Sequence, residues 1–151
     1  MKKLLLISSL MLGLGACSSN QVPNSKQLSY DVQTLPASTV ISVLAEDDFK
    51  IPKNGQIVEQ TGTFKTLDNT YDELGNKVLI PRDAIISGTY TNDGIHCSVA
   101  WKSIYANKDA FKEKHGSFAI AETSAPSICD PVLGVKTGNR LTVWFKNGVK
   151  D

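Results

Sequence analysis

The sequence predicts an all-β domain, a small antiparallel barrel or sandwich of about six to eight short strands. Three observations support this. Runs of β-branched and aromatic residues recur along the chain at short intervals. Clusters of Gly, Pro, Asn and Asp, the residues that favour turns, separate these runs. The clearest runs alternate apolar and polar residues with a period of two, which is typical of strands with one buried face.

The first half of the domain carries strand signals in three segments. Residues 37–45 contain a β-rich centre, although two helical turns are an alternative for this segment. Residues 57–65 form the second candidate strand. In the third segment, Pro81 interrupts a strand that begins at Val78 and resumes over residues 84–90. We therefore expect at least three strands in the first half of the domain.

A hairpin is predicted at Thr91-Asn92-Asp93-Gly94, because Asp-Gly favours tight turns between strands. The strand that returns from this turn alternates most clearly of all. One of its faces is expected in the core and consists of Ile95, Cys97, Val99 and Trp101. Tyr90, on the strand before the turn, is expected to lie opposite the apolar face.

In the last third of the domain, the sequence predicts less regular structure before a final strand. Residues 107–116 are polar and should form an exposed loop or short helix, and residues 118–121 form a weaker strand. The strand over residues 140–146 alternates again and places Trp144 opposite its apolar side chains. Tyr90 and Trp144 are thus our candidates for a partner-binding surface, because amphipathic aromatic residues are enriched in interfaces.

The N-terminus has the features of a bacterial lipoprotein signal over residues 1–16. The apolar stretch from Leu4 to Ala16 has 13 residues, fewer than the roughly 17–25 that a spanning helix needs. The ending Leu14-Gly15-Ala16-Cys17 resembles a lipobox, which implies cleavage before Cys17 and acylation of that cysteine. Ordinary cleavage after Ala16 is the alternative, but Leu14 would then stand where a small residue is preferred.

The lipoprotein interpretation also sets location and domain organisation. Ser18, rather than Asp, follows the cysteine, which implies sorting to the outer membrane with the domain facing the periplasm. Residues 17–28 are predicted to be a polar, lipidated tether, and residues 29–151 the folded domain. Several acyl chains would give durable anchoring.

Size and charge suit one domain that does not bind nucleic acid. Removal of residues 1–16 leaves 135 of the 151 residues, enough to bury a substantial core. The whole chain has 16 basic and 15 acidic residues. Loss of Lys2 and Lys3 leaves 14 basic residues against 15 acidic ones, a net charge of −1. A nucleic-acid partner is not expected, because it would require a clustered basic face.

The cysteines predict one disulfide. With Cys17 acylated, Cys97 and Cys129 remain as an even pair in an oxidising compartment. Two buried free thiols are the alternative. In the chain-entropy model, a bridge that closes a loop of this length stabilises the fold by roughly 3 kcal/mol.

The sequence contains no recognisable catalytic or metal-binding motif, and we expect neither an enzyme nor a cofactor. His96 and His115 are interpreted as surface residues rather than zinc ligands. The acidic residues at 46–48, and the pair Asp68 and Asp72, could bind calcium or supply an acid–base pair, but their spacing does not match a calcium loop. A ligand platform of Trp101, Trp144 and Tyr105 is a further alternative, although Trp101 is better placed in the core.

Five phrases in order resemble the C-terminal domain of TrbI-type conjugation proteins, the barrel-bearing core subunits of type IV secretion channels. The most distinctive is Gly75–Tyr90, an apolar triplet followed by Pro, a turn and a Gly-x-Tyr strand. The others are Leu35–Leu44, Gly55–Val58, Val99–Trp101 and Gly138–Asn147. The resemblance covers most of the mature chain. It implies a β-barrel that assembles with other channel subunits, or with copies of itself in a ring.

The chain also departs from that family. A lipobox replaces the family's cytoplasmic tail, inner-membrane helix and Pro-rich stretch, and 36 residues stand where the family inserts a long helical segment. Asp83 occupies a turn position where Gly is expected, which is tolerable because Asp accepts a left-handed conformation better than most residues. The resemblance therefore carries over the barrel but not pore formation.

Two functions follow as expectations. The first is an outer-membrane lipoprotein that serves as a structural or assembly subunit of a type IV secretion or conjugative-transfer apparatus. The alternative is a free-standing periplasmic binding lipoprotein, such as an inhibitor of a lysozyme-type enzyme.

Overall fold

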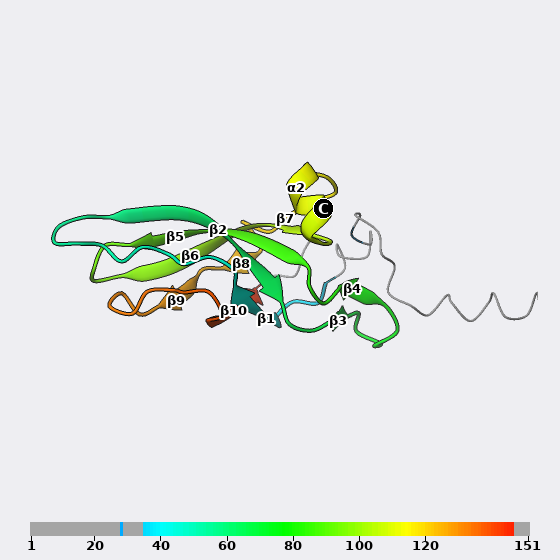
Figure 1. Cartoon of the computed structure of the whole chain (residues 1–151). Coiled ribbons are helices and arrows are strands. Elements are labelled where there is room, and N and C mark those ends of the chain that lie inside the picture. The colour runs from blue at the N-terminus through cyan, green and yellow to red at the C-terminus, as the bar shows by residue number, and fades with distance from the viewer. Residues whose placement is uncertain (1–27, 29–34, 147–151) are drawn as a thin grey trace, which may run out of the picture.

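A computed structural model describes Leu28 and residues 35–146 of the chain. Its elements are β1 (Thr39–Ala45), β2 (Val58–Thr66), β3 (Thr70–Tyr71), β4 (Val78–Ile80), β5 (Ile85–Asn92), β6 (Cys97–Tyr105), α2 (Lys108–Glu113), β7 (Phe118–Ala119), β8 (Ser124–Ala125), β9 (Ser127–Cys129) and β10 (Arg140–Phe145) (Figure 1). The predicted signal peptide (1–16), Cys17 and the tether before Leu28 lie outside the described residues. Leu28 itself is buried and belongs to the core. The described residues contain no helix that is both long and apolar enough to cross a membrane.

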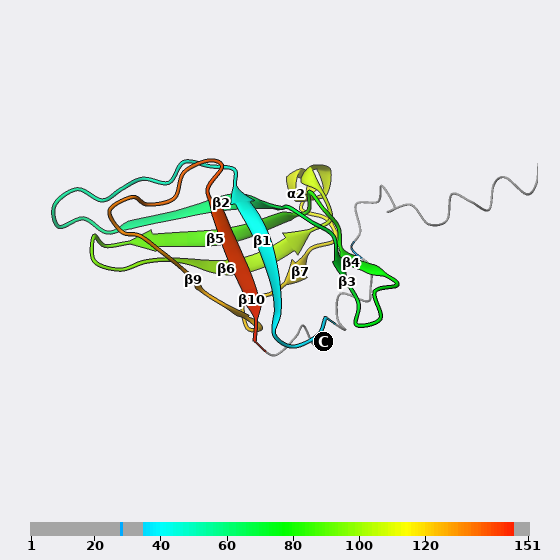
Figure 2. The same ribbon diagram turned by 90° about the horizontal axis from the view of Figure 1, so that it is seen from below.

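The strands form a curved antiparallel sheet, a half-barrel, beside a small second sheet. The order in the main sheet is β7-β6-β5-β2-β1-β10-β8, β9 also pairs with β6, and β3 pairs with β4. Figure 2 shows β1 and β10 crossing steeply over the long strands β2, β5 and β6. The two groups of strands thereby enclose the core between them. The prediction of an all-β antiparallel fold is confirmed.

A short segment, residues 124–129, spans the gap between the two ends of the curved sheet. Its first part, β8, pairs with the end of β10, and its second part, β9, pairs with the start of β6. Pro126 separates the two parts, as expected of a residue that cannot donate a ladder hydrogen bond. The Trp101 indole N–H donates to the Ser127 hydroxyl (2.9 Å), which donates to the Thr142 carbonyl. This hydroxyl therefore links β6 to β10 across the gap.

The disulfide prediction is confirmed. Cys97 and Cys129 lie directly opposite each other on β6 and β9, with their Cα atoms 4.9 Å apart, and a disulfide joins them. The bridge fixes the segment 124–129 to the main sheet.

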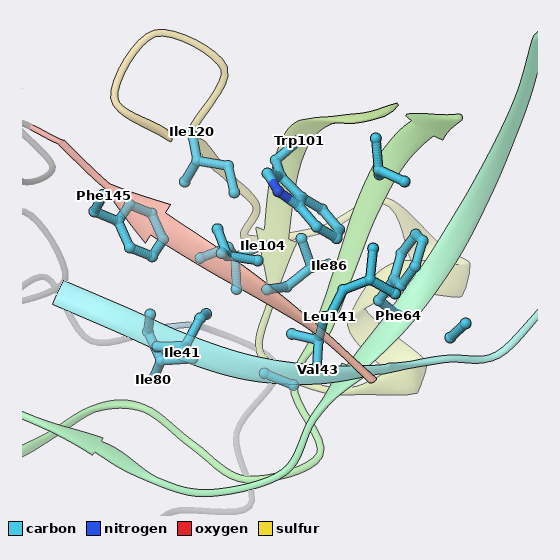
Figure 3. Close-up of a cluster of buried hydrophobic side chains, with 14 of the residues drawn as sticks. Ile41, Val43, Phe64, Ile80, Ile86, Trp101, Ile104, Ile120, Leu141 and Phe145 are labelled. Atoms are coloured by element: carbon cyan, nitrogen blue, oxygen red, sulfur yellow. The ribbon is translucent and has the colours of Figure 1, made fainter. Parts of the chain in front are cut away.

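The core is built around aromatic rings. Phe49 contacts both Phe64 and Tyr90, with ring centroids 5.6 and 4.9 Å apart, and Phe64 meets the edge of Trp101 at 4.8 Å. Figure 3 shows Trp101 and Phe64 directed towards aliphatic side chains from β1, β5, β6 and β10. Trp101 is 2 % exposed, so its predicted place in the core is confirmed.

Two predictions about which side chains are exposed were wrong. Tyr90 is fully buried. It lies opposite Val99, a core residue, and its hydroxyl accepts a hydrogen bond from Asn92 Nδ2 at 2.8 Å. A tyrosine can be buried when its hydroxyl finds such a partner. Ile95, expected in the core, is 76 % exposed because it belongs to the turn before β6 rather than to the strand.

A β-bulge changes the alternation in the middle of β6. The register with β5 shifts between Ser87 and Gly88, so that Ser87 faces Ser103 while Gly88 faces Trp101. Before the bulge the odd-numbered residues of β6 are buried, and after it Ile104 is buried instead. Lys102 and Ser103 consequently both lie on the outer face of the sheet.

Candidate functional site

Trp144 projects outwards from β10, as predicted. Leu141, Val143 and Phe145 on the same strand are buried, while the Trp144 side chain remains 46 % exposed. A large aromatic side chain in this position offers considerable apolar surface to a partner.

Neighbouring apolar side chains extend this surface across three segments. Val40 on β1 and Ala125 on β8 lie directly opposite Trp144 in the two ladders. Val40 is 57 % exposed and Ile128, on β9, is 81 % exposed. Pro126 is exposed between β8 and β9. These residues form a surface that we call the Trp144 patch, and it consists of Val40, Ala125, Pro126, Ile128 and Trp144.

A pocket of about 490 Å³ lies within the patch, along the boundary between β10 and the segment 124–129. Trp144 and Ile128 line it together with Arg140 and Thr142. Arg140 is exposed, and its guanidinium donates to the Ser42 hydroxyl at 3.0 Å. Chemically, this arrangement can accept an apolar side chain and place an acidic group of a partner near the guanidinium.

The three aromatic residues considered as a ligand platform do not share one surface. Trp101 is in the core and Trp144 is on the outer surface. Tyr105 packs its ring against the edge of Phe111 on α2, with the centroids 5.2 Å apart. The platform hypothesis is therefore wrong for this trio.

Three of the acidic residues considered as metal ligands, Asp47, Asp48 and Asp72, instead accept hydrogen bonds that hold loops in place. Asp47 accepts a hydrogen bond from the Thr63 amide and Asp48 one from the Thr137 amide, both at 2.8 Å. The hydrogen bond from the Thr137 amide is the main cause that lowers the pKa of Asp48. Hydrogen bonds from backbone amides, that of Lys77 first, likewise lower the pKa of Asp72. Within residues 35–146 and Leu28, no group of three or more His, Cys, Asp or Glu side chains is placed to hold a metal ion.

Both histidines are on the surface. His96 is exposed in the β5–β6 turn, and its Nδ1 lies 3.5 Å from an Asp93 carboxylate oxygen. His115 is exposed after α2. Their interpretation as surface residues is confirmed.

A second pocket, of about 500 Å³, was not predicted from the sequence. It lies on the outer face of β2, β5 and β6 beside α2. Its lining includes Lys102 and Ser103, the two residues that the bulge turns outwards. The signal in the sequence was the spacing of Trp101 and Ile104: core residues three apart cannot both follow a strict period of two.

No family model matches the chain, and no curated protein matches it significantly.

Proposed function

We propose that this chain is an outer-membrane lipoprotein that works as a structural or assembly subunit of a type IV secretion or conjugative-transfer apparatus. The observation that carries the proposal is the Trp144 patch, a group of neighbouring apolar side chains around an exposed tryptophan on the sheet. The lipobox and the ordered phrases that resemble TrbI-type proteins supply the location and the kind of assembly.

The composition of the patch suits contact with another protein. Tryptophan and arginine are the residues most enriched among those that dominate binding energy, and here Trp144 and Arg140 line one pocket. Burial of an exposed aromatic side chain in a partner would remove its apolar surface from water. The chain's partners would then be other channel subunits, reached through this patch, and the membrane, reached through the lipid.

The Cys97–Cys129 disulfide and the hydrogen bonds of the Ser127 hydroxyl also support the Trp144 patch as the binding surface. Both hold the segment 124–129 between β6 and β10, so the patch residues on β8 and β9 are fixed before a partner arrives. A preformed surface loses less conformational entropy on binding than a mobile one.

The test is co-purification of the chain with channel subunits from envelopes. Trp144→Ala should fold normally but lose affinity for its complex by about thirtyfold or more, because truncation of a dominant interface aromatic costs about 2 kcal/mol or more. Tyr71→Ala is the matched control, since Tyr71 is similarly exposed (47 %) but lies on the small sheet β3–β4. The proposal fails if the wild-type chain recovers no secretion component.

One observation favours the alternative of a free-standing binder. Aliphatic side chains are exposed in three loops, namely Ile57, Ile95, Val132 and Leu133. Asn92 Nδ2 donates to the Pro131 carbonyl at 3.0 Å, which ties the β5–β6 turn to the loop after β9. Such loops could enter the cleft of a lysozyme-type enzyme. If this is their role, Leu133→Asp and Ile95→Asp should abolish capture of that enzyme while Trp144→Ala leaves it unchanged.

A further inference from the structure

The pocket beside α2 contains features of a small-molecule site that protein docking at the Trp144 patch does not use. Its volume, about 500 Å³, is within the range of roughly 300–1,000 Å³ found for ligand pockets. Its floor is the outer face of three paired strands, and its wall is formed by side chains from β6 and the end of α2.

Hydroxyl groups cover the floor. Thr63, Ser87 and Ser103 lie in one row, because Thr63 pairs with Ser87 and Ser87 pairs with Ser103. Thr61 lines the same pocket one step along β2. Ser87 is largely buried and Ser103 half-buried in this lining, and a serine hydroxyl can both donate to a ligand and accept from it.

The wall combines aromatic rings with positive charge. Tyr105 and Phe111 meet edge to face, and the Lys114 ammonium lies 3.9 Å from the centroid of the Phe111 ring. Lys114 has a left-handed backbone (φ 55°) where α2 ends, and its amide donates to carbonyls of the helix. This conformation fixes the point at which the side chain leaves the helix.

The bulge in β6 supplies the second cation. It turns Lys102 and Ser103 outwards together, so that two consecutive residues, one with an ammonium and one with a hydroxyl, line the pocket. Lys102 has no ion-pair partner among the residues that the structure describes. Asp47 is the single carboxylate in the lining, and one of its oxygens already accepts from the amide and hydroxyl of Thr63. Two lysines against one carboxylate leave the lining positive.

We infer that this pocket binds a small acidic saccharide, a hydroxylated ring that carries a carboxylate or phosphate group. The hydroxyl floor matches the ring hydroxyls, the Tyr105 and Phe111 rings add apolar surface to the wall, and the two lysines match the anion. Cell-wall sugars with carboxylates and phosphorylated sugars of lipid headgroups share this chemistry. The inference does not depend on the proposed assembly function, since it concerns different strands of the sheet.

The experiment uses the full chain, with its disulfide intact, in a detergent without sugar headgroups. The probes are N-acetylmuramic acid, N-acetylglucosamine phosphate and neutral N-acetylglucosamine, which differ mainly in the anionic group. Binding is followed by NMR through the backbone amides of Ser103, Tyr105 and Phe111. At least one acidic sugar should shift these amides and bind about fivefold or more tightly than the neutral sugar. The acidic sugar that binds more tightly shows whether the pocket prefers a carboxylate or a phosphate group, and so which of the two kinds of sugar it takes.

Substitution of each lysine then tests whether its positive charge contributes to binding of the anionic group. Lys102→Gln and Lys114→Gln should each weaken binding of the acidic sugar by about five- to tenfold and leave binding of the neutral sugar unchanged. Lys53→Gln, in the loop between β1 and β2, is the control and should change neither. The inference is overturned if the acidic and neutral sugars bind equally, if neither shifts the three amides, or if Lys53→Gln weakens binding as much as the pocket variants do.

Discussion

Two glycines in adjacent strands make room for the aromatic core. Gly62 on β2 lies directly opposite Gly88 on β5. A methyl group on Gly62 would collide with the Phe49 ring, and one on Gly88 would lie 2.8 Å from a Val99 methyl carbon and 3.1 Å from the Trp101 ring. Neither glycine is required by a positive φ. Their function is to let large rings approach the backbone closely.

The first prediction at this scale concerns Trp101. Trp101→Ala should lower the free energy of unfolding by about 3–5 kcal/mol, because it leaves a cavity beside Phe64 and removes the indole donor to Ser127. Trp101→Phe is the control: it keeps an aromatic ring but not the N–H group, so its cost should be smaller. Urea unfolding under oxidising conditions measures both. A Trp101→Ala variant within about 1 kcal/mol of the wild type would contradict the core assignment.

At the level of elements, several loops are held by aspartate side chains that accept backbone hydrogen bonds. In the β5–β6 hairpin, one Asp93 oxygen accepts from the amides of Ile95 and His96 at 2.8 and 2.6 Å. The hydrogen bond from the His96 amide is the main cause that lowers the pKa of Asp93 from its ordinary value of 3.8. The ionised carboxylate is therefore favoured in the folded state.

The sign of the pH effect follows from that direction. A carboxylate with a pKa lowered by folding contributes stability above its unfolded pKa, and this contribution is lost as the pH falls through the folded pKa. Asp93→Asn keeps a side-chain acceptor but cannot ionise. We expect the variant to be less stable than the wild type at pH 6 and to approach it as the pH falls below about 4. Urea unfolding at several pH values tests this. A stability difference that is independent of pH would exclude the charge as its cause.

At the level of elements, the sequence predicts some parts of this fold and not others. The hairpin and the final strand follow from local chemistry, and both are observed. The left-handed backbone of Asp83 (φ 65°) was anticipated only through the family resemblance. Tyr90 was assigned to the wrong face because Ile85 and Ile86 are both apolar, so alternation alone does not say which face of β5 is inside. Pairing with β2 and β6 decides this, and such pairing is not a local property. The pocket beside α2 depends on the bulge in β6, and the only sequence signal for that bulge is the odd spacing of Trp101 and Ile104.

At the level of the whole molecule, the Trp144 patch and the pocket beside α2 lie on different strands. The Trp144 patch is formed by β1, β10 and the segment 124–129, whereas the pocket beside α2 is formed mainly by β2, β5 and β6. A domain held to a membrane by its N-terminus could engage a protein at one surface and a saccharide at the other. Both proposals gain from a location in the envelope, which depends on the N-terminal segment.

The last prediction concerns that anchor. Cys17→Ser should prevent acylation, because serine lacks the thiol to which lipid is attached, and the chain should remain uncut or appear in the periplasm without an acyl label. Metabolic labelling with a palmitate analogue, followed by fractionation of the envelope, measures both outcomes. Trp144→Ala serves as a control, since it should acquire the label and stay with the outer membrane even if it loses its partner. Incorporation of label by Cys17→Ser would mean that lipid is attached elsewhere. A wild-type chain that is processed after Ala16 and released without lipid would instead favour the ordinary signal peptide, and the assembly proposal would then lose its membrane anchor.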